Sequence, residues 1–244
     1  MREVRFSQCI FNLNSGQQTE ALLFAGSRQR PAKLIVFVHG NNKGTGAWSS
    51  VRMGHLLAAD GFAAVLPSQP GYGESSGPRD FCGPKTVDAM SCVTRVFQER
   101  LNVSPTCTVF WGVSRGAIVG ALQADLHPGL VGSYILQSGE YNIRQAIFDS
   151  RLDTNIRTTF AEEAGMSTEV ICERTAAEHT KNIEDEITIV HVRDDRVTPL
   201  AQAHEYFERL RSAGKRVKMI TWNRGGHRIS VDDAYARIKQ AMIL

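Results

Sequence analysis

The segment TCTVFWGVSRGAIVGALQADLH, residues 106–127, decides the fold of this chain. Its first part, Thr106–Trp111, is an apolar run rich in β-branched and aromatic residues, which is typical of a strand buried on both faces. Its last part, 115–127, carries apolar residues at every fourth position and ends before a Pro-Gly pair, which indicates a helix. The turn 112–116 between them therefore predicts a strand, a sharp turn and a helix in direct succession.

The same alternation extends along the chain on both sides of this segment. Buried-strand runs separated by amphipathic helical patterns of about 10–15 residues are typical of a parallel sheet with helices on both faces. We therefore expect an α/β protein with a mostly parallel central sheet. The expected strands are two short ones within 4–26, then 34–38, 63–66, 106–111, 133–136, 187–192 and 217–221, and the expected helices are 48–60, 85–101, 115–127, 200–213 and 230–243.

One stretch, residues 140–182, interrupts the alternation. It separates two core strands, contains no buried-strand run and is rich in charged residues and helix formers. A crossover helix with a long loop and a small helical insertion covering a site both fit this pattern. We expect a single domain over 1–244, with 140–182 as a cap-like helical insertion.

The turn Gly112-Val113-Ser114-Arg115-Gly116 matches the pattern GxSxG. Between a strand and a helix, this pattern is typical of a nucleophile elbow, in which a strained turn exposes the serine at the carboxyl edge of the sheet. The helix N-terminus also supplies backbone N–H groups that favour a developing oxyanion. Ser114 is therefore the candidate nucleophile.

A nucleophilic serine needs a base and an acid, which follow it along the chain in this architecture. His227 follows a glycine-rich loop between the last strand and the last helix, whereas His204 falls within a helical pattern, so His227 is the candidate base. The loop after strand 187–192 offers two acids, Asp194 and Asp195. The spacing to the following Val-Thr-Pro favours Asp194, with Asp195 as the alternative.

Acyl transfer also needs two N–H donors aimed at the oxyanion. The backbone amide of Arg115, next after the serine, is one candidate. The other is the amide of Asn41, because the His39-Gly40 turn ends strand 34–38 and glycine permits a backbone path closed to other residues. We expect His39 to brace this loop rather than to take part in the chemistry.

Taken together, these motifs resemble the α/β-hydrolase fold enzymes, and more closely the single-domain esterases and the catalytic domain of the prolyl oligopeptidase (S9-like) family. This resemblance implies a triad of Ser114, Asp194 and His227. The large N-terminal propeller of the oligopeptidases has no room in 244 residues, so we expect small substrates. The resemblance rests on His39-Gly40, the segment from Pro70 to Pro84, Gly112-x-Ser114-x-Gly116, Asp194–Pro199, Ala213-Gly214-Lys215 and Gly226-His227.

Composition argues against several other classes. The net charge of +3 is too small to indicate a nucleic-acid or membrane partner by itself, and no apolar run approaches the ~20 residues that span a bilayer. Five scattered cysteines without a CxxC pair indicate neither a zinc site nor a disulfide framework, so we expect a cytoplasmic protein. No phosphate-binding loop, dinucleotide fingerprint or metal-ligand spacing is present, and we expect no cofactor and no metal.

The resulting hypothesis is a serine hydrolase that cleaves a small carboxylic ester through an acyl-enzyme. Arg196, close after the acid, is a candidate for binding a substrate carboxylate. The alternatives are a peptidase or amidase acting on small acyl-peptides, a C–C hydrolase, lyase or perhydrolase of the same fold, and a binding module without catalysis.

Overall fold

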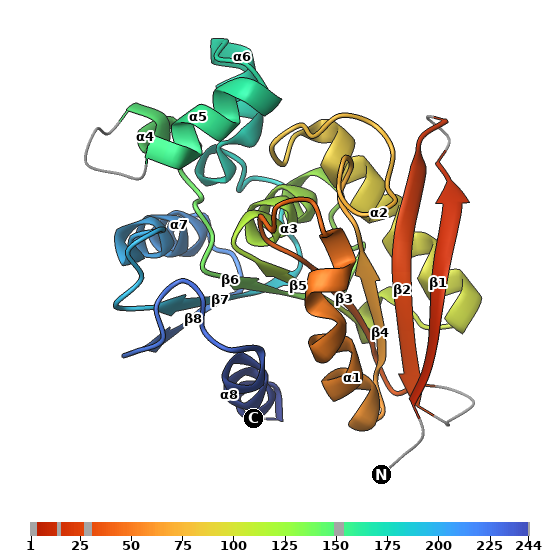
Figure 1. Cartoon of the computed structure of the whole chain (residues 1–244). Coiled ribbons are helices and arrows are strands. Elements are labelled where there is room, and N and C mark those ends of the chain that lie inside the picture. The colour runs from red at the N-terminus through yellow and green to blue at the C-terminus, as the bar shows by residue number, and fades with distance from the viewer. Residues whose placement is uncertain (1–3, 14–15, 27–30, 149–153, 244) are drawn as a thin grey trace.

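The computed structural model describes residues 4–13, 16–26, 31–148 and 154–243. Its strands form one eight-stranded sheet in the order β1-β2-β4-β3-β5-β6-β7-β8 (Figure 1). β2 runs antiparallel to its neighbours β1 and β4, and all the other pairs are parallel. The strands are β1 Val4–Asn12, β2 Gln18–Gly26, β3 Leu34–Val38, β4 Ala63–Pro67, β5 Thr108–Val113, β6 Ser133–Gln137, β7 Glu186–Val192 and β8 Val217–Trp222.

Helices cover both faces of the sheet. Helices α1 and α8 lie on one face, and α2, α3 and α7 lie on the other (Figure 1). Alternate residues of each strand point to opposite faces, so Leu34 and Val36 of β3 join the core under α2 and α3, while Ile35 and Phe37 join the core under α1. The helices are α1 Val51–Ala59, α2 Pro84–Leu101, α3 Arg115–Leu126, α7 Leu200–Ser212 and α8 Val231–Ile243.

The register of the central strands brings the functional loops to one edge. Val38, the last residue of β3, pairs with Gly112 of β5, and Gly112 pairs with Leu136 of β6. Since these strands are parallel, the loops that follow them emerge side by side at the carboxyl edge of the sheet. The predicted α/β fold with a mostly parallel sheet is confirmed.

Two predicted elements differ from the structure by more than one residue at an end. The predicted strand 106–111 starts two residues later, because Pro105–Cys107 forms a short 3₁₀ helix in which Cys107 N donates to Ser104 O. The predicted helix 48–60 is divided into a 3₁₀ turn, Gly46–Ser50, and α1. In both places a short 3₁₀ turn replaces the first two or three residues of the predicted element.

The stretch between β6 and β7 is helical. It contains α4 Ile143–Phe148, α5 Thr154–Glu163, α6 Thr168–Arg174 and a 3₁₀ turn Ala176–Glu178, which gather at one end of the molecule (Figure 1). Arg174 attaches α6 to the core because its Nε donates to Asp80 O at 2.9 Å. Whether these helices act as a cap stays a prediction. Among the helices of the described residues, none has the length and apolar character needed to cross a membrane.

Candidate active site

The turn between β5 and α3 has the strained geometry predicted for it. Ser114 has φ 53° and ψ −115°, a conformation that L-residues rarely adopt. Both flanking glycines are required sterically, because a Cβ on Gly112 would lie 2.1 Å from Gly116 O and one on Gly116 would lie 2.2 Å from Val38 O. The packing of strand, turn and helix therefore allows no side chain at either position, and it presents Ser114 at the sheet edge.

His227 lies against this serine. The loop after β8 places its Nε2 2.9 Å from Ser114 Oγ, and its side chain is 15% exposed. His204, the other candidate, is exposed on α7. The sequence therefore led to the histidine that the fold brings to the serine, although the two residues are far apart along the chain.

The acid that meets His227 is Asp195, and the prediction of Asp194 was wrong in this respect. His227 Nδ1 lies 2.8 Å from Asp195 Oδ2, whereas Asp194 is exposed and accepts a hydrogen bond from Gly226 N. The cause is the tight turn that ends β7, in which Asp195 N donates to Val192 O. This turn directs Asp195 inward under the histidine and Asp194 outward to the neighbouring loop.

Asp195 is held by its own loop. Its Oδ1 accepts the backbone N–H groups of Val197 and Thr198, both at 2.9 Å, and the Thr198 hydroxyl donates to its Oδ2 at 3.0 Å. Burial acts to raise the pKa of Asp195, but the hydrogen bond and charge of His227 together with these N–H donors outweigh it and leave the pKa lowered. The carboxylate is therefore ionised at neutral pH.

Thr198 was not among the predicted site residues. Its hydroxyl lies 3.2 Å from His227 Nδ1, and its carbonyl accepts a hydrogen bond at 2.8 Å from the buried His191. The spacing Asp-x-x-Thr at 195–198 was the available signal. A threonine three residues after an aspartate can donate hydrogen bonds from its backbone N–H and its hydroxyl to the carboxylate.

The loop after β3 passes directly against the nucleophile. A Cβ on Gly40 would lie 3.0 Å from Ser114 Cβ, so the absence of a side chain at Gly40 lets the loop pass close against the serine. His39 braces the loop as expected: its Nδ1–H donates to Gly40 O at 2.7 Å, and its Nε2 accepts from Gln69 N at 3.2 Å. Burial lowers the pKa of His39 to about 4, so its ring is neutral in this role.

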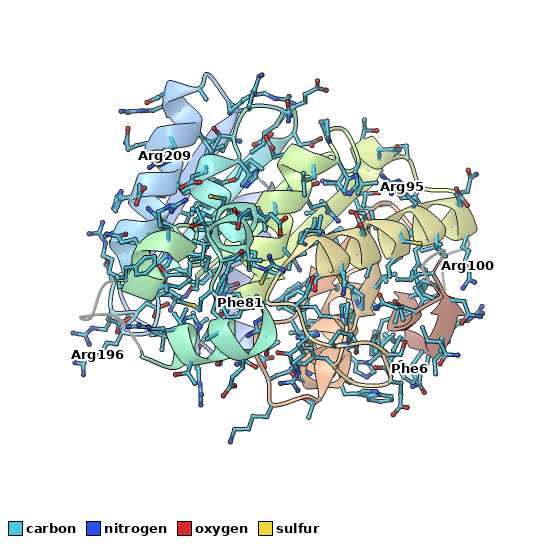
Figure 2. The ribbon with its side chains drawn as sticks, turned by 90° about the horizontal axis from the view of Figure 1, so that it is seen from above. Phe6, Phe81, Arg95, Arg100, Arg196 and Arg209 are labelled. Carbon is cyan, nitrogen blue, oxygen red and sulfur yellow. The ribbon has the colours of Figure 1, made fainter. Side chains whose placement is uncertain are left out.

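The remaining predicted residues occupy different settings. Arg115 begins α3 next to the serine, and its guanidinium is buried against the side chains of Tyr72 and Glu163. Arg196 is exposed and reaches outward at the rim of the molecule in Figure 2, whereas Phe81 lies near the centre of that view. The oxyanion role of the Asn41 and Arg115 amides and the substrate-binding role of Arg196 stay predictions. Within the described ranges, no group of three His, Cys, Asp or Glu side chains is arranged to hold a metal ion.

Comparisons with known proteins agree with this architecture. A family model described as the alpha/beta hydrolase fold matches residues 33–171. A Bacillus subtilis (strain 168) protein named the uncharacterized peptidase YtmA is 24% identical over 219 residues, which are 87% of this chain and 82% of that protein.

Two solved structures extend the comparison. The Pyrococcus furiosus esterase Pf2001 matches with a TM-score of 0.74 at 12% identity over 97% of this chain and 90% of that chain. The Pyrococcus horikoshii acylaminoacyl peptidase matches with a TM-score of 0.76 at 19% identity over 99% of this chain, but this chain spans only 41% of the peptidase. With the fold, the elbow and the family match in agreement, the chain belongs to the α/β-hydrolase fold family.

Proposed function

We propose that the protein is a serine hydrolase that cleaves a small carboxylic ester through an acyl-enzyme. One observation carries this proposal: a hydrogen-bonded chain runs from Ser114 Oγ to His227 at 2.9 Å and on to Asp195 at 2.8 Å. A serine hydroxyl is a weak nucleophile until a base removes its proton. Ionised Asp195 keeps the proton of His227 on Nδ1, so that Nε2 is the free base facing the serine.

The reaction follows from this arrangement. Ser114 Oγ attacks the ester carbonyl carbon while His227 Nε2 takes the hydroxyl proton. The backbone N–H groups of Asn41 and Arg115 stabilise the oxyanion that forms. The C–O bond to the alcohol then breaks as His227 returns the proton to the leaving oxygen. Water, activated by the same histidine, attacks the acyl-serine and releases the carboxylic acid.

Hydrolysis of small acyl-peptides is the second candidate. It is favoured by the similarity to YtmA, which is named a peptidase, and to an acylaminoacyl peptidase. An ester is the first choice because its alcohol is expelled more easily than the amine of an amide. The same triad serves both reactions, which differ in the leaving group that His227 protonates.

The test compares wild type with Ser114→Ala on two substrate panels. One panel contains p-nitrophenyl esters from acetyl to octanoyl, and the other contains N-acylated amino acid p-nitroanilides. We expect kcat/KM to be higher on short esters, and we expect Ser114→Ala to lower kcat by roughly 10⁶-fold. Hydrolysis retained by Ser114→Ala would overturn the proposal, and faster turnover of anilides would favour the peptidase.

A fluorophosphonate probe separates catalysis from binding. We expect stoichiometric labelling of wild type and none of Ser114→Ala. A well-folded wild-type protein that resists labelling would favour a binding module. Mass spectrometry of the products distinguishes ester cleavage from C–C bond cleavage, which releases different fragments.

A further inference from the structure

A continuous chain of side-chain hydrogen bonds links the helical segment to the loop beside the nucleophile. Glu163, the last residue of α5, accepts a bond of 2.8 Å from Arg115 Nη1. The same nitrogen donates to the Tyr72 hydroxyl at 2.6 Å, and that hydroxyl donates to Asn41 Oδ1 at 3.2 Å. Residues from four separate parts of the sequence are thereby joined.

The direction of these bonds is fixed by the chemistry of the groups. A guanidinium has only donors, so the Tyr72 oxygen must accept from Arg115 and is left with its single proton to donate to Asn41. Tyr72 is 1% exposed, and burial raises the pKa of its hydroxyl, which therefore keeps the proton that it donates. The Asn41 side chain is consequently held in one orientation, with its oxygen toward the tyrosine.

The charge of Arg115 explains why Glu163 belongs to this series of hydrogen bonds. Arg115 is 5% exposed, and a buried guanidinium needs a carboxylate partner. Glu163 supplies it, with Arg115 also stacked over Phe81 at 4.5 Å. Arg79 lies over the Tyr72 ring at 4.2 Å, with its Nη1 3.9 Å from the other Glu163 oxygen. The position of α5 is thus connected to the orientation of Tyr72.

We propose that Tyr72 is a positioning residue that holds the Asn41 loop in its oxyanion-binding geometry, and that Glu163 of α5 sets Tyr72 through Arg115. This inference rests on the proposed hydrolase function, because it concerns the backbone N–H of Asn41 as a donor to the oxyanion. Gly40 gives the loop a flexible backbone directly before Asn41. The hydrogen bond from Tyr72 to the Asn41 side chain therefore restricts the direction in which the backbone N–H of Asn41 points. Docking of the helical segment is therefore coupled to completion of the oxyanion site.

The first test is Tyr72→Phe, which keeps the aromatic ring under Arg79 and removes only the hydroxyl. We expect kcat on the best ester to fall about tenfold, because a misdirected donor weakens transition-state stabilisation, while KM stays within about twofold. The rate of fluorophosphonate labelling should fall in parallel. A variant with an unchanged kcat, or one whose loss appears only in KM, would overturn the positioning role.

The second test is Glu163→Gln, with Glu162→Gln as the matched control on the exposed side of the same helix. We expect Glu163→Gln to lower kcat about fivefold and Glu162→Gln to leave it unchanged. The variant with both Tyr72→Phe and Glu163→Gln should resemble Tyr72→Phe alone, because Glu163 acts on Asn41 only through the Tyr72 hydroxyl. Multiplicative losses, or a Glu163→Gln variant with full kcat, would contradict the coupling.

These results are separable from failure of the proposed function. If Ser114→Ala abolishes hydrolysis while Tyr72→Phe and Glu163→Gln keep full kcat, the hydrolase stands and the coupling fails. If Ser114→Ala remains active, the proposed function itself fails. Thermal unfolding of each variant, followed by circular dichroism, identifies a loss of activity that comes only from a loss of fold.

Discussion

Two adjacent aspartates have opposite surroundings at the residue scale. Asp195 has a side chain with 0% exposure and contacts His227, whereas Asp194 is exposed and bonds only Gly226 N among the hydrogen bonds of the described residues. An asparagine at 195 can present its NH₂ group to Nδ1 and so stabilise the wrong histidine tautomer. The two positions therefore allow a matched comparison.

We expect Asp195→Asn to lower kcat by about 10⁴-fold, the size of effect that follows loss of the correct tautomer. Asp194→Asn, which keeps an oxygen for Gly226 N, should change kcat by less than about threefold. Steady-state kinetics of both variants on one ester checks this prediction. A larger loss from Asp194→Asn than from Asp195→Asn would restore Asp194 as the acid.

Local sequence signals account for which site residues were predictable. Ser114 was predictable because glycines two residues before and after it mark a turn that excludes side chains. His227 was predictable because a glycine-rich loop after a strand leaves few other places for the base. The choice between Asp194 and Asp195 was not, because it depends on where the turn after β7 closes, and the hydrogen bond from Asp195 N to Val192 O that fixes this point is visible only in the structure.

At the scale of elements, the β5–α3 junction has no free volume. Gly116 lies under the carbonyl of Val38, and a methyl group there would need the β3 and α3 backbones to separate. We expect Gly116→Ala to lower the free energy of unfolding by about 4 kcal/mol and to prevent probe labelling of Ser114. Gly129→Ala is the control. With φ at 74° this substitution strains the backbone, but no atom lies within 4 Å of the added methyl group.

Urea denaturation of both variants measures the difference. Gly129→Ala should lose about 1 kcal/mol, because it adds backbone strain without a clash. Gly116 is not among the glycines with positive φ, so a loss there no larger than at Gly129 would mean that the elbow relaxes around the added methyl group and that close packing does not require the glycine. The elements themselves were predictable because apolar periodicity marks their interiors, whereas their ends depend on turns such as Pro105–Cys107.

At the scale of the whole molecule, layering was predictable and the arrangement of the helical segment was not. Strands such as β3 are apolar on both faces, which is sufficient to require helices on both sides. The position of α4–α6 depends instead on contacts between distant residues, including the stacking of Tyr141 on Tyr206 at 4.6 Å. Such pairs have no signature within a local window of sequence, and the same applies to the link from Glu163 to Asn41.

A buried carboxyl group, Glu140, affects the stability of the whole molecule. It follows β6, is 2% exposed, and neither of its oxygens has a hydrogen-bond partner among the described residues. Burial, together with repulsion from Asp195 and Glu205, raises its pKa from 4.5 to about 8. The native protein therefore holds one proton more than the unfolded chain between pH 4.5 and 8. The contribution of Glu140 to the free energy of unfolding is therefore fully present below that window and is lost as the pH rises through it.

Glu140→Gln keeps the shape of the protonated side chain and removes its titration, so the variant should match wild type near pH 5 and exceed it at pH 8. The pH slope from one proton is about 1.4 kcal/mol per pH unit, which makes the difference accumulated from pH 6.5 to 8 roughly 2 kcal/mol, or about 5 °C in Tm.

His39 titrates in the opposite sense, because its pKa is lowered from 6.5 to about 4 and its protonation destabilises the native state in acid. Calorimetry of wild type, Glu140→Gln and the exposed control Glu162→Gln at pH 5, 6.5 and 8 isolates the contribution of Glu140, since the His39 contribution is common to all three proteins. A constant Tm difference between Glu140→Gln and wild type at every pH would mean that Glu140 keeps the same charge in the folded protein and the unfolded chain.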